Sequence, residues 1–287
     1  RCNIFSIGDS EKLDFGKKTR IIRPFDGVCR GLVPLNNPQS KKCCKKVPIF
    51  VFGGCSVAGE SSKGAMDVAR GALKEHFGYD GFRPGQETLV EAVLSGRDCL
   101  GVMPTGAGKS ICYQIPGVVL PGLTLVVSPL VSLMGDQVRA LLDAGVRGSY
   151  LNSTLTPGQQ GTVMRRALTG TYDIMYVAPE RLADPRFIEF ASQASIPLIA
   201  IDEAHCVSQW GQDFRPAYLG IGEFIGALPK RPIVAALTAT ATEKVREDIV
   251  SLLGLRNPAT VVTGFDRPNL HFAVEQLPSK RKLTRIV

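Results

Sequence analysis

The sequence lacks the features that mark membrane-spanning and zinc-binding proteins. No stretch approaches the roughly 18 consecutive apolar residues that a membrane-spanning helix needs, and none of the eight cysteines forms a C-x2-C pair of the kind that binds zinc. Histidine occurs three times and tryptophan once. The chain instead has a globular composition, because 44% of its 287 residues are hydrophobic and can form a sizeable core. We therefore expect no membrane association.

The excess of positive charge is confined to the start of the chain. Residues 1–65 hold 12 Lys and Arg against 5 Asp and Glu, whereas residues 66–287 hold 22 against 21. The net charge of +8 therefore gives no support for nucleic-acid binding by residues 66–287. The three cysteines of this larger part, Cys99, Cys112 and Cys206, are typical of reduced, buried thiols. This cysteine usage predicts a cytoplasmic protein.

The pattern of the sequence changes at Met66, which is the first methionine. Residues 1–65 mix Pro, Gly, Lys and Cys without a sustained period, whereas regular periodicity begins at Met66. We expect the natural start at or near Met66 and leave residues 1–65 unassigned, as a disordered or non-native segment. The predicted globular lobe occupies residues 66–264, and residues 265–287 follow it.

From Met66 onward, short apolar runs alternate with amphipathic helical patterns, for example at residues 129–145 and 243–254. Seven runs are typical of buried strands: "DCLGVM" from Asp98, "TLVVS" from Thr124, "SYLN" from Ser149, "DIMYVA" from Asp173, "PLIAID" from Pro197, "PIVAALT" from Pro232 and "ATVVT" from Ala259. Continuous apolar strands separated by helices indicate a parallel sheet covered on both faces. The predicted fold class is α/β, with a mostly parallel central sheet flanked by helices.

The stretch "GVMPTGAGKS" at residues 101–110 is typical of a phosphate-binding loop, because it follows the first strand and opens a helix. Glycine lets the backbone turn its amides inward around phosphate oxygens at a helix N-terminus. Lys109 supplies a cation for the β- and γ-phosphates, and Ser110 a hydroxyl for Mg²⁺. Met103 stands where the strict pattern has glycine. The predicted phosphate-binding positions are Thr105, Gly106, Ala107, Gly108, Lys109 and Ser110.

Two adjacent carboxylates follow the buried run "LIAI". Open parallel sheets bind their ligands at the carboxyl ends of their strands, so Asp202 is expected to hold Mg²⁺ together with Ser110. Glu203 is the predicted base that orients and deprotonates the attacking water. His205, two residues further on, is expected to sense the γ-phosphate or to contact a neighbouring motif. These residues and the phosphate loop predict an ATPase site.

The remaining motifs narrow the class of nucleotide-hydrolysing protein. The chain has no N-K-x-D guanine-binding motif and no L-S-G-G-Q signature, which argues against GTPases and ABC-type ATPases. Seven stretches occur in order: "FGYDGFRPGQ" from Phe77, "MPTGAGKS" from Met103, "VVSPLVSLMGDQV" from Val126, "YVAPERL" from Tyr176, "DEAHCVSQWGQDFRP" from Asp202, "ALTATAT" from Ala236 and "FDRPNL" from Phe265. In order and spacing, the chain from Met66 to Val287 resembles the RecQ family of DNA helicases.

The resemblance implies a RecA-like P-loop NTPase lobe and assigns roles to matching residues. Tyr79 would stack on adenine, while Arg83 and Gln86 would read its edge. Ser128 and Arg181 match positions that contact the phosphate backbone of the tracked strand. The "TAT" motif, which holds Thr238 and Thr240, would link the ATP site to the nucleic-acid groove, although a core strand and a helix cap account for it almost as well. Gln212 stands at a catalytic position where family members often have histidine.

Trp210 is the only tryptophan and lies in a polar loop just past the acid pair. A lone tryptophan is more often a core residue. The same loop, however, also holds Phe214 and Arg215, and aromatic rings with an arginine form a common platform for single-stranded nucleic acid. The resemblance likewise implies that this loop senses DNA and reports it to the ATP site.

The function implied by the resemblance is an ATP-dependent DNA helicase of 3′ to 5′ polarity, which acts in recombination and repair with ATP and Mg²⁺. Implied partners are single-stranded and forked DNA, single-stranded-DNA-binding proteins and recombination proteins, in a bacterial cytoplasm near the nucleoid. Residues 265–287 would be a linker and the start of a second lobe, so we expect a fragment of the enzyme. Two alternatives remain: an RNA helicase or translocase with the same motor, and a module that binds nucleotide and DNA without turnover.

Overall fold

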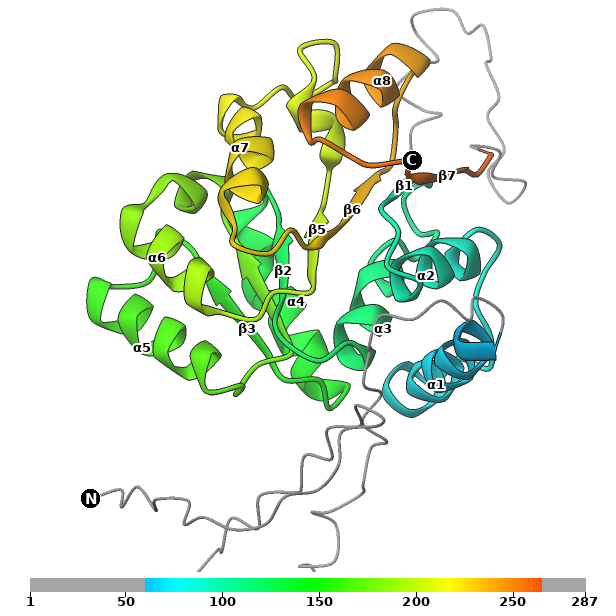
Figure 1. The fold of residues 1–287 in the computed structure, drawn as a ribbon, viewed down its shortest axis with the longest axis horizontal. Helices are drawn as coiled ribbons and strands as arrows, with labels where there is room; N and C mark the ends of the chain where they lie inside the picture. The colour runs from blue at the N-terminus through cyan, green and yellow to red at the C-terminus, as the bar shows by residue number, and fades with distance from the viewer. Residues whose placement is uncertain (1–59, 265–287) are drawn as a thin grey trace, which may run out of the picture. The chain divides into compact units, whose positions relative to one another are not determined.

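A seven-stranded parallel sheet forms the centre of the protein (Figure 1), whose computed structural model describes residues 60–264. Predictions for residues 1–59 and 265–287 lie outside the described residues. The strands are β1 (Cys99–Val102), β2 (Thr124–Val127), β3 (Gly148–Leu151), β4 (Ile174–Val177), β5 (Leu198–Ile201), β6 (Ile233–Thr238) and β7 (Ala259–Val262). Their order is β3-β4-β2-β5-β6-β1-β7. All seven predicted strands and the parallel sheet are confirmed.

Helices cover both faces of the sheet because its strands are apolar on both sides. Every residue of β1, β2, β4 and β5 is buried, which is the burial expected of a parallel sheet in a three-layer fold. The helices are α1 (Glu60–Phe77), α2 (Gln86–Leu94), α3 (Ile111–Val119), α4 (Val131–Asp143), α5 (Pro157–Leu168), α6 (Pro185–Gln193), α7 (Gly220–Ala227) and α8 (Glu243–Leu252). Short 3-10 turns are η2 (Pro179–Ala183), η3 (Ala204–Val207) and η4 (Pro216–Leu219).

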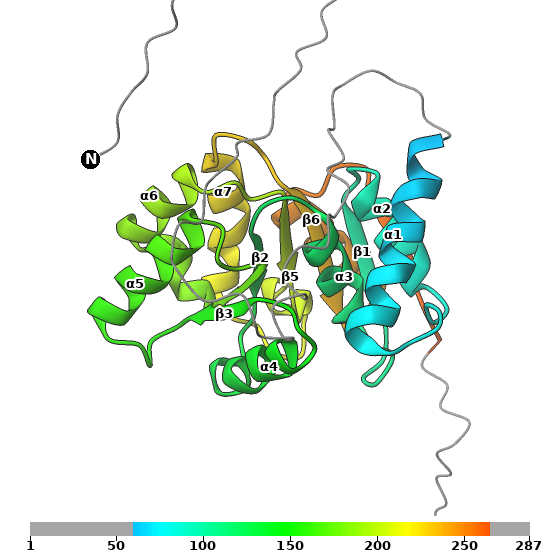
Figure 2. The ribbon, with the colours of Figure 1, turned by 90° about the horizontal axis from the view of Figure 1, so that it is seen from below.

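Two hydrophobic cores lie on opposite faces of the sheet. One packs side chains of α5, α6, α7 and α8 against the strands, and the other packs side chains of α2, α3 and α4 against the opposite face. A third cluster joins α1 to α2 and α3, and Met66 is buried in it. Figure 2 shows α1 on the outer side of α2 and α3. Helix α1 begins at Glu60, six residues before the expected boundary at Met66. The division at that residue stays a prediction.

Hydrogen-bonding residues define where several helices begin. Thr156 and Gln159 form a capping box at the start of α5, in which each side chain bonds the other's backbone amide. The Asp184 carboxylate accepts from the Arg186 amide at the start of α6, and the Thr242 hydroxyl accepts from the Val245 amide at the start of α8. These caps fix the turns that lead from strand ends into helices.

Asp98 anchors the amino end of the sheet. Its carboxylate is 3% exposed and accepts from the Arg231 guanidinium at 2.6 Å, the Val234 amide at 2.9 Å and the Arg256 amide at 2.7 Å. These bonds join the start of β1 to β6 and to the segment before β7. A buried carboxylate is stable only when its charge is matched in this way. The bonds therefore fix the relative positions of strands whose opposite ends carry the functional motifs.

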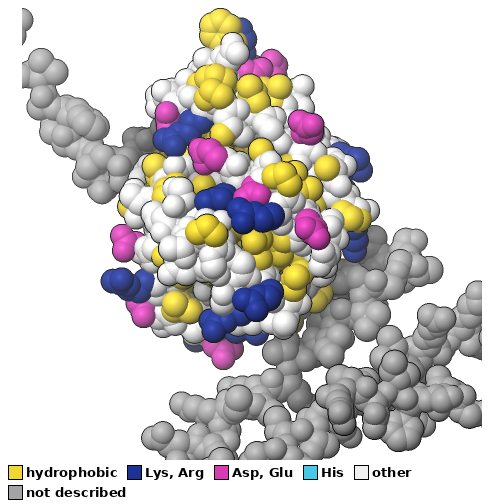
Figure 3. All heavy atoms as spheres, turned by 90° about the vertical axis from the view of Figure 1, so that its left-hand side faces the viewer, with side chains coloured by type: hydrophobic (Ala, Val, Ile, Leu, Met, Phe, Trp, Pro, Cys, Tyr) yellow, Lys and Arg dark blue, Asp and Glu magenta, His cyan; other side chains and the backbone are white. Residues whose placement is uncertain are grey.

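The surface that covers α5 and α6 has charges of both signs. In Figure 3, Lys and Arg side chains are interspersed with Asp and Glu, and hydrophobic side chains lie between them. This view of one face agrees with the nearly balanced charge of residues 66–287. Within residues 60–264, no helix combines the length and the apolar character that crossing a membrane requires.

Candidate nucleotide and nucleic-acid site

The loop between β1 and α3 has the backbone of a phosphate cradle. Gly106 and Gly108 have positive φ angles of 86° and 78°, a conformation that L side chains rarely adopt. Among the amides from Gly106 to Ser110, only that of Ala107 donates to a described backbone carbonyl, that of Pro104 at 3.1 Å. The other amides of the loop have no described acceptor and suit the anionic oxygens of a phosphate.

Met103 fits this loop although the strict motif has glycine. Its side chain is 1% exposed and packs in the core cluster that includes Leu89 of α2. Its amide donates to the Thr238 carbonyl at 2.9 Å, which ties the loop to the end of β6. Met103 therefore adds packing to the core, and the loop still has Gly106 and Gly108 at its positive φ positions.

The structure places the predicted adenine-binding segment against the phosphate loop. The Gln86 amide nitrogen donates to the carbonyls of Ala107 and Gly108, both at 3.0 Å, and its oxygen accepts from the Arg83 amide at 2.8 Å. The Arg83 guanidinium donates to the Gly106 carbonyl at 2.6 Å. Gln86 is 3% exposed. Because both hydrogens of its side-chain amide already donate to carbonyls, the side chain can only accept a further bond. Its adenine-reading role stays a prediction.

Tyr79 differs from these two residues because it is 49% exposed. It lies between α1 and α2, next to Asp80, which forms an ion pair with Lys74 at 2.9 Å. A half-exposed ring is accessible for stacking on an adenine base, and this role of Tyr79 stays a prediction.

The acid pair lies at the carboxyl end of β5, on an unusual backbone. Glu203 has φ 48° and ψ 47°, in the left-handed region that only glycine favours. Such strain concentrates at functional sites and persists only where the surroundings impose it. Here the buried Tyr218 hydroxyl donates to the Asp202 carbonyl at 2.9 Å, and the Asp202 carboxylate accepts from the Glu203 amide at 3.1 Å. Tyr218 thus fixes the turn that directs the two carboxylates.

The environment of Asp202 fits a cation ligand. Burial, together with the neighbouring Glu203 charge, raises the pKa of Asp202 to about 6. A divalent cation would compensate this charge. The Ser110 hydroxyl does not cap α3, and its role as a second ligand stays a prediction. Within residues 60–264, no three His, Cys, Asp or Glu side chains form a metal cluster. A hydroxyl and a carboxylate are oxygen donors of the kind that Mg²⁺ prefers.

The Lys109 ammonium donates to the Met103 carbonyl at 3.3 Å. It also acts through charge on both carboxylates, since it lowers the pKa of Asp202 and of Glu203. The structure thus brings Lys109 close enough to Asp202 and Glu203 for its charge to affect the pKa of both, although Lys109 and Asp202 are 93 positions apart in the chain.

His205 connects the acid pair to the "TAT" motif. Its Nδ1 lies 3.3 Å from a Glu203 carboxylate oxygen and 2.8 Å from the Thr238 hydroxyl. Because the Thr238 hydroxyl donates to the Thr240 carbonyl at 3.1 Å, it accepts from His205, so Nδ1 carries a proton. Contacts with the Cys206 sulfur and with Glu203 raise the pKa of His205 to about 9. The structure thus places His205 in contact with the neighbouring "TAT" motif, and its bond to Glu203 lowers the pKa of that carboxylate. Its functional role stays a prediction.

Trp210 is exposed, so a core role is excluded. Two thirds of its surface, 66%, is accessible to solvent. The Lys244 ammonium of α8 lies 3.6 Å from the centre of its ring, a cation–π contact that contributes about 0.5–1 kcal/mol at an exposed site. Its amide donates at 3.1 Å to the Ser208 hydroxyl, which in turn donates to the Asp248 carboxylate at 2.6 Å. Residues 208–215, named here the aromatic loop, are therefore held by α8.

The aromatic loop returns on itself closely. A Cβ atom on Gly211 would lie 2.3 Å from the His205 carbonyl oxygen, so only glycine fits there. The Arg215 amide donates to the Cys206 carbonyl at 2.9 Å and closes the loop. The Arg215 side chain bonds Asp213 and donates to the Pro129 carbonyl at 2.9 Å. Arg215 therefore connects the aromatic loop to the segment that follows β2.

The other residues predicted to contact nucleic acid differ in exposure. Arg181 of η2 is partly exposed, and its guanidinium lies near Asp184 and the Asn152 carbonyl. Phe214 is half-buried. Ser128 is only 6% exposed, and its hydroxyl accepts a long bond from the Leu130 amide. A phosphate contact from Ser128 would need a local rearrangement, and the role stays a prediction.

Gln212, which was predicted to be catalytic, is exposed on the aromatic loop. Among the described residues, its side chain has no hydrogen bond to the acid pair. Its role is untested by this geometry.

Three residues that hold the site were not singled out from the sequence: Tyr218, Lys244 and Asp248. Tyr218 gave no local signal because its partner is a main-chain carbonyl 16 residues away. Lys244 and Asp248 are four residues apart on α8, so they share a helix face. Only the fold shows that this face meets the aromatic loop.

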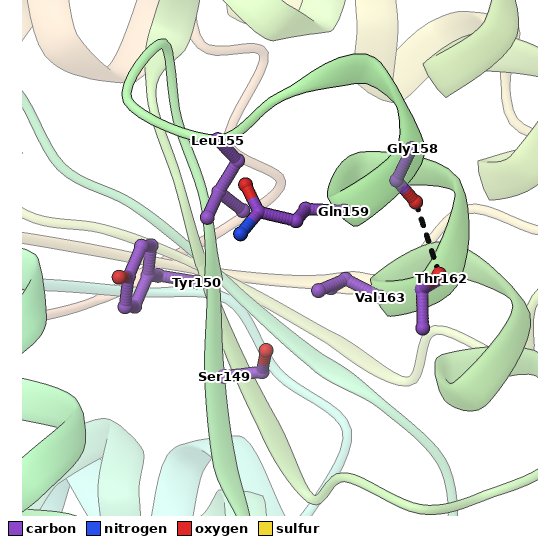
Figure 4. Close-up of a pocket in the computed structure, with 7 residues that line it drawn as sticks. All are labelled: Ser149, Tyr150, Leu155, Gly158, Gln159, Thr162 and Val163. Carbon is purple, nitrogen blue, oxygen red and sulfur yellow. Dashed lines mark hydrogen bonds between the residues drawn. The ribbon is translucent and has the colours of Figure 1, made fainter.

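An open groove lies elsewhere, at the β3 edge of the sheet (Figure 4). Its lining residues come from β3, from the turn before α5 and from the first two turns of α5, and they are Ser149, Tyr150, Leu155, Gly158, Gln159, Thr162 and Val163. None of these residues belongs to the motifs described above. The groove is therefore separate from the nucleotide and nucleic-acid residues.

Fold and phosphate loop together define a P-loop lobe of RecA-like architecture. The profile of the family described as DEAD/DEAH box helicase matches residues 83–249. The chain belongs to this family.

Comparison with curated proteins confirms the resemblance to RecQ helicases. The chain is 43% identical over 241 residues to ATP-dependent DNA helicase RecQ of Pasteurella multocida, covering 81% of the chain and 38% of that protein. It is 46% identical over 221 residues to the protein of the same name from Haemophilus influenzae, covering 77% and 36%. The chain thus spans well under half the length of these relatives.

Comparison with solved structures confirms the fold. The crystal structure of a hypothetical ATP-dependent RNA helicase from Sulfolobus tokodaii matches 69% of this chain and 57% of its own, with a TM-score of 0.54 and 22% identity. At this identity the match describes the architecture alone.

The phosphate loop generates the first prediction. Gly108→Ala should abolish nucleotide binding, because the new Cβ would lie 2.5 Å from the Gln86 amide nitrogen. Binding of a fluorescent ATP analogue measures the effect. The control is Gly170→Ala, which has a similar positive φ of 71° and nothing within 4 Å of the added Cβ. The left-handed backbone alone should cost each variant about 1–2 kcal/mol of stability. Equal loss of nucleotide binding in both variants would contradict the steric account.

The second prediction concerns pH. The pKa of His205 is about 9 in the folded protein and about 6.5 in an unfolded chain. Its charge therefore adds stability that is fully present below about pH 6.5 and is lost as the pH rises through about 9. The difference in free energy of unfolding between the wild type and His205→Gln should shrink over this range in urea titrations. His76→Gln, on α1, provides the background. A difference that does not vary with pH would contradict the ion pair with Glu203.

Proposed function

We propose that the protein uses ATP hydrolysis to move along single-stranded DNA with 3′ to 5′ polarity and to separate duplexes. One observation carries this proposal. A single segment, Glu203–Arg215, begins at the carboxyl end of β5 and contains the exposed ring of Trp210. Relatives named ATP-dependent DNA helicases support DNA as the substrate.

The residues of the site divide the chemistry between them. The amides of the phosphate loop and Lys109 bind the β- and γ-phosphates. Ser110 and Asp202 would hold Mg²⁺, which when bound would supply positive charge beside the phosphates. Glu203, which His205 keeps ionised and oriented, accepts the proton of the attacking water. Tyr79 stacks on the adenine.

Nucleic acid is bound along the neighbouring strand ends. Trp210 and Phe214 stack on bases, while Arg215 and Arg181 contact phosphates, which positions a strand without reading its sequence. Roles in recombination and repair, in a bacterial cytoplasm with single-stranded-DNA-binding and recombination proteins, follow from the resemblance and are part of this proposal.

ATP hydrolysis by the chain, measured with single-stranded DNA and with RNA of the same sequence, tests the function. DNA should stimulate hydrolysis more than RNA does. Equal stimulation by both would favour an RNA helicase or general translocase. Binding of ATP and DNA without any turnover would identify a binding module.

Trp210→Ala should remove the stimulation by DNA and leave ATP binding unchanged. The loss of stacking, about 1–3 kcal/mol per base, should weaken binding of single-stranded DNA about five- to 150-fold. Ile188→Ala, which removes an exposed side chain of α6, is the control. If Trp210→Ala lost ATP binding and DNA binding to the same extent, the residue would be structural.

A further inference from the structure

Helix α8 contacts Trp210 at two points. The Lys244 ammonium covers one face of the indole ring at 3.6 Å from its centre. Asp248 accepts from the Ser208 hydroxyl at 2.6 Å, and that hydroxyl accepts from the Trp210 amide at 3.1 Å. Lys244 holds the side chain, and Asp248 holds the main chain through Ser208. Figure 1 shows α8 beside the segment that follows β5, and this packing joins α8 to η3.

Hydrophobic burial does not orient the Trp210 ring. With 66% of its surface exposed, the residue lacks the surrounding side chains that fix a core aromatic. The Lys244 contact is therefore the interaction that decides which way the ring points. With a cation on one face and 66% of the residue exposed, part of the ring surface remains accessible to a nucleobase.

We propose that Lys244 is a positioning residue for single-stranded nucleic acid: it holds the Trp210 ring outward, with its free face ready to stack on a base. Asp248 supports this arrangement by fixing the turn that carries Trp210. The inference rests on the proposed function, since it assigns a nucleobase to the free face. A side chain held in its binding orientation loses less conformational freedom when the ligand binds, which raises affinity.

The contact also connects Trp210 to the nucleotide motifs. Lys244 lies four residues after Thr240 of the "TAT" motif, and Thr238 of that motif bonds His205. Segment 203–210 and segment 238–248 are thus joined at three points, His205 with Thr238, Ser208 with Asp248, and Trp210 with Lys244. Helix α8, which holds the Trp210 ring, follows the "TAT" motif. That motif contacts the acid-pair segment through His205.

Trp210 is the only tryptophan, so its fluorescence reports this contact directly. In the chain without ligand, Lys244→Met keeps most of the side-chain length but removes the cation. It should lower the polarisation of Trp210 emission, because the ring moves more freely. Lys244→Arg should restore the wild-type signal, since a guanidinium also binds an aromatic face. Lys230→Met, an exposed lysine before β6, should have no effect. Unchanged polarisation in Lys244→Met would overturn the proposal.

Binding of a labelled oligo-dT provides the second measurement. Lys244→Met should weaken binding about two- to fivefold, equal to about 0.5–1 kcal/mol, and should have no further effect in a Trp210→Ala background. The dependence of affinity on salt should not change. A decrease of about 0.7 in the salt slope would show that Lys244 contacts a phosphate directly and would overturn the positioning role.

The same titration separates this inference from the function on which it rests. No binding of oligo-dT by the wild-type chain would overturn both. Normal binding by the wild type, lost in Trp210→Ala but unchanged in Lys244→Met, would overturn the role of Lys244 alone. Asp248→Ala gives an independent check, because it should lower the polarisation of Trp210 emission while Lys244 remains.

Discussion

The parallel pairing of β5, β6 and β1 is the constraint on which the site depends. Val102 of β1 pairs with Thr238 of β6, and Ala236 of β6 pairs with Ile201 of β5. This register brings the phosphate loop, the "TAT" motif and the acid pair together at the carboxyl ends of the strands. The Asp98 network fixes the amino ends. A shift of one residue along any of these strands would reverse its side chains and separate the motifs.

Strand β5 lies where two sets of motifs meet. On one side, β6 and β1 carry residues for the nucleotide, and on the other, β2 and β4 lead into the segments of Ser128 and Arg181. The chain that leaves β5 contacts both sets. Through His205 it bonds Thr238, and through Arg215 it bonds the Pro129 carbonyl. The left-handed turn at Glu203 gives this segment its direction. A displacement of the nucleotide motifs would therefore be transmitted to the segments that follow β2 and β4, and the reverse also holds.

Energies in the aromatic loop favour a sensor over a rigid binding site. The cation–π contact of Lys244 contributes about 0.5–1 kcal/mol, less than the roughly 1–3 kcal/mol of one stacked base. The contact therefore orients the ring without holding it rigidly. By contrast, the main chain of the loop is closed by the Arg215 amide and limited by Gly211. The Trp210 side chain can therefore change its orientation while the main chain of the aromatic loop is held in place.

Much of the fold and part of the site could be predicted from the sequence. Apolar runs located all seven strands, and the glycines with Lys109 located the phosphate loop, because these signals are local. Local pattern failed where a partner lies far along the chain. Gln86 was assigned to the adenine edge from its motif alone, yet its amide hydrogens are donated to carbonyls 21 and 22 residues away. Likewise, neither the exposure of Trp210 nor its contact with Lys244 could be derived without the packing of α8 against the loop.

The proposed function implies that the nucleotide end and the nucleic-acid end of segment 203–215 sense each other. The most direct measurement is Trp210 emission during titration with a non-hydrolysable ATP analogue and Mg²⁺, without nucleic acid, alongside calorimetry of the same binding. We predict an emission change whose midpoint matches the dissociation constant from calorimetry. Binding of the analogue by calorimetry with unchanged Trp210 emission would contradict the account.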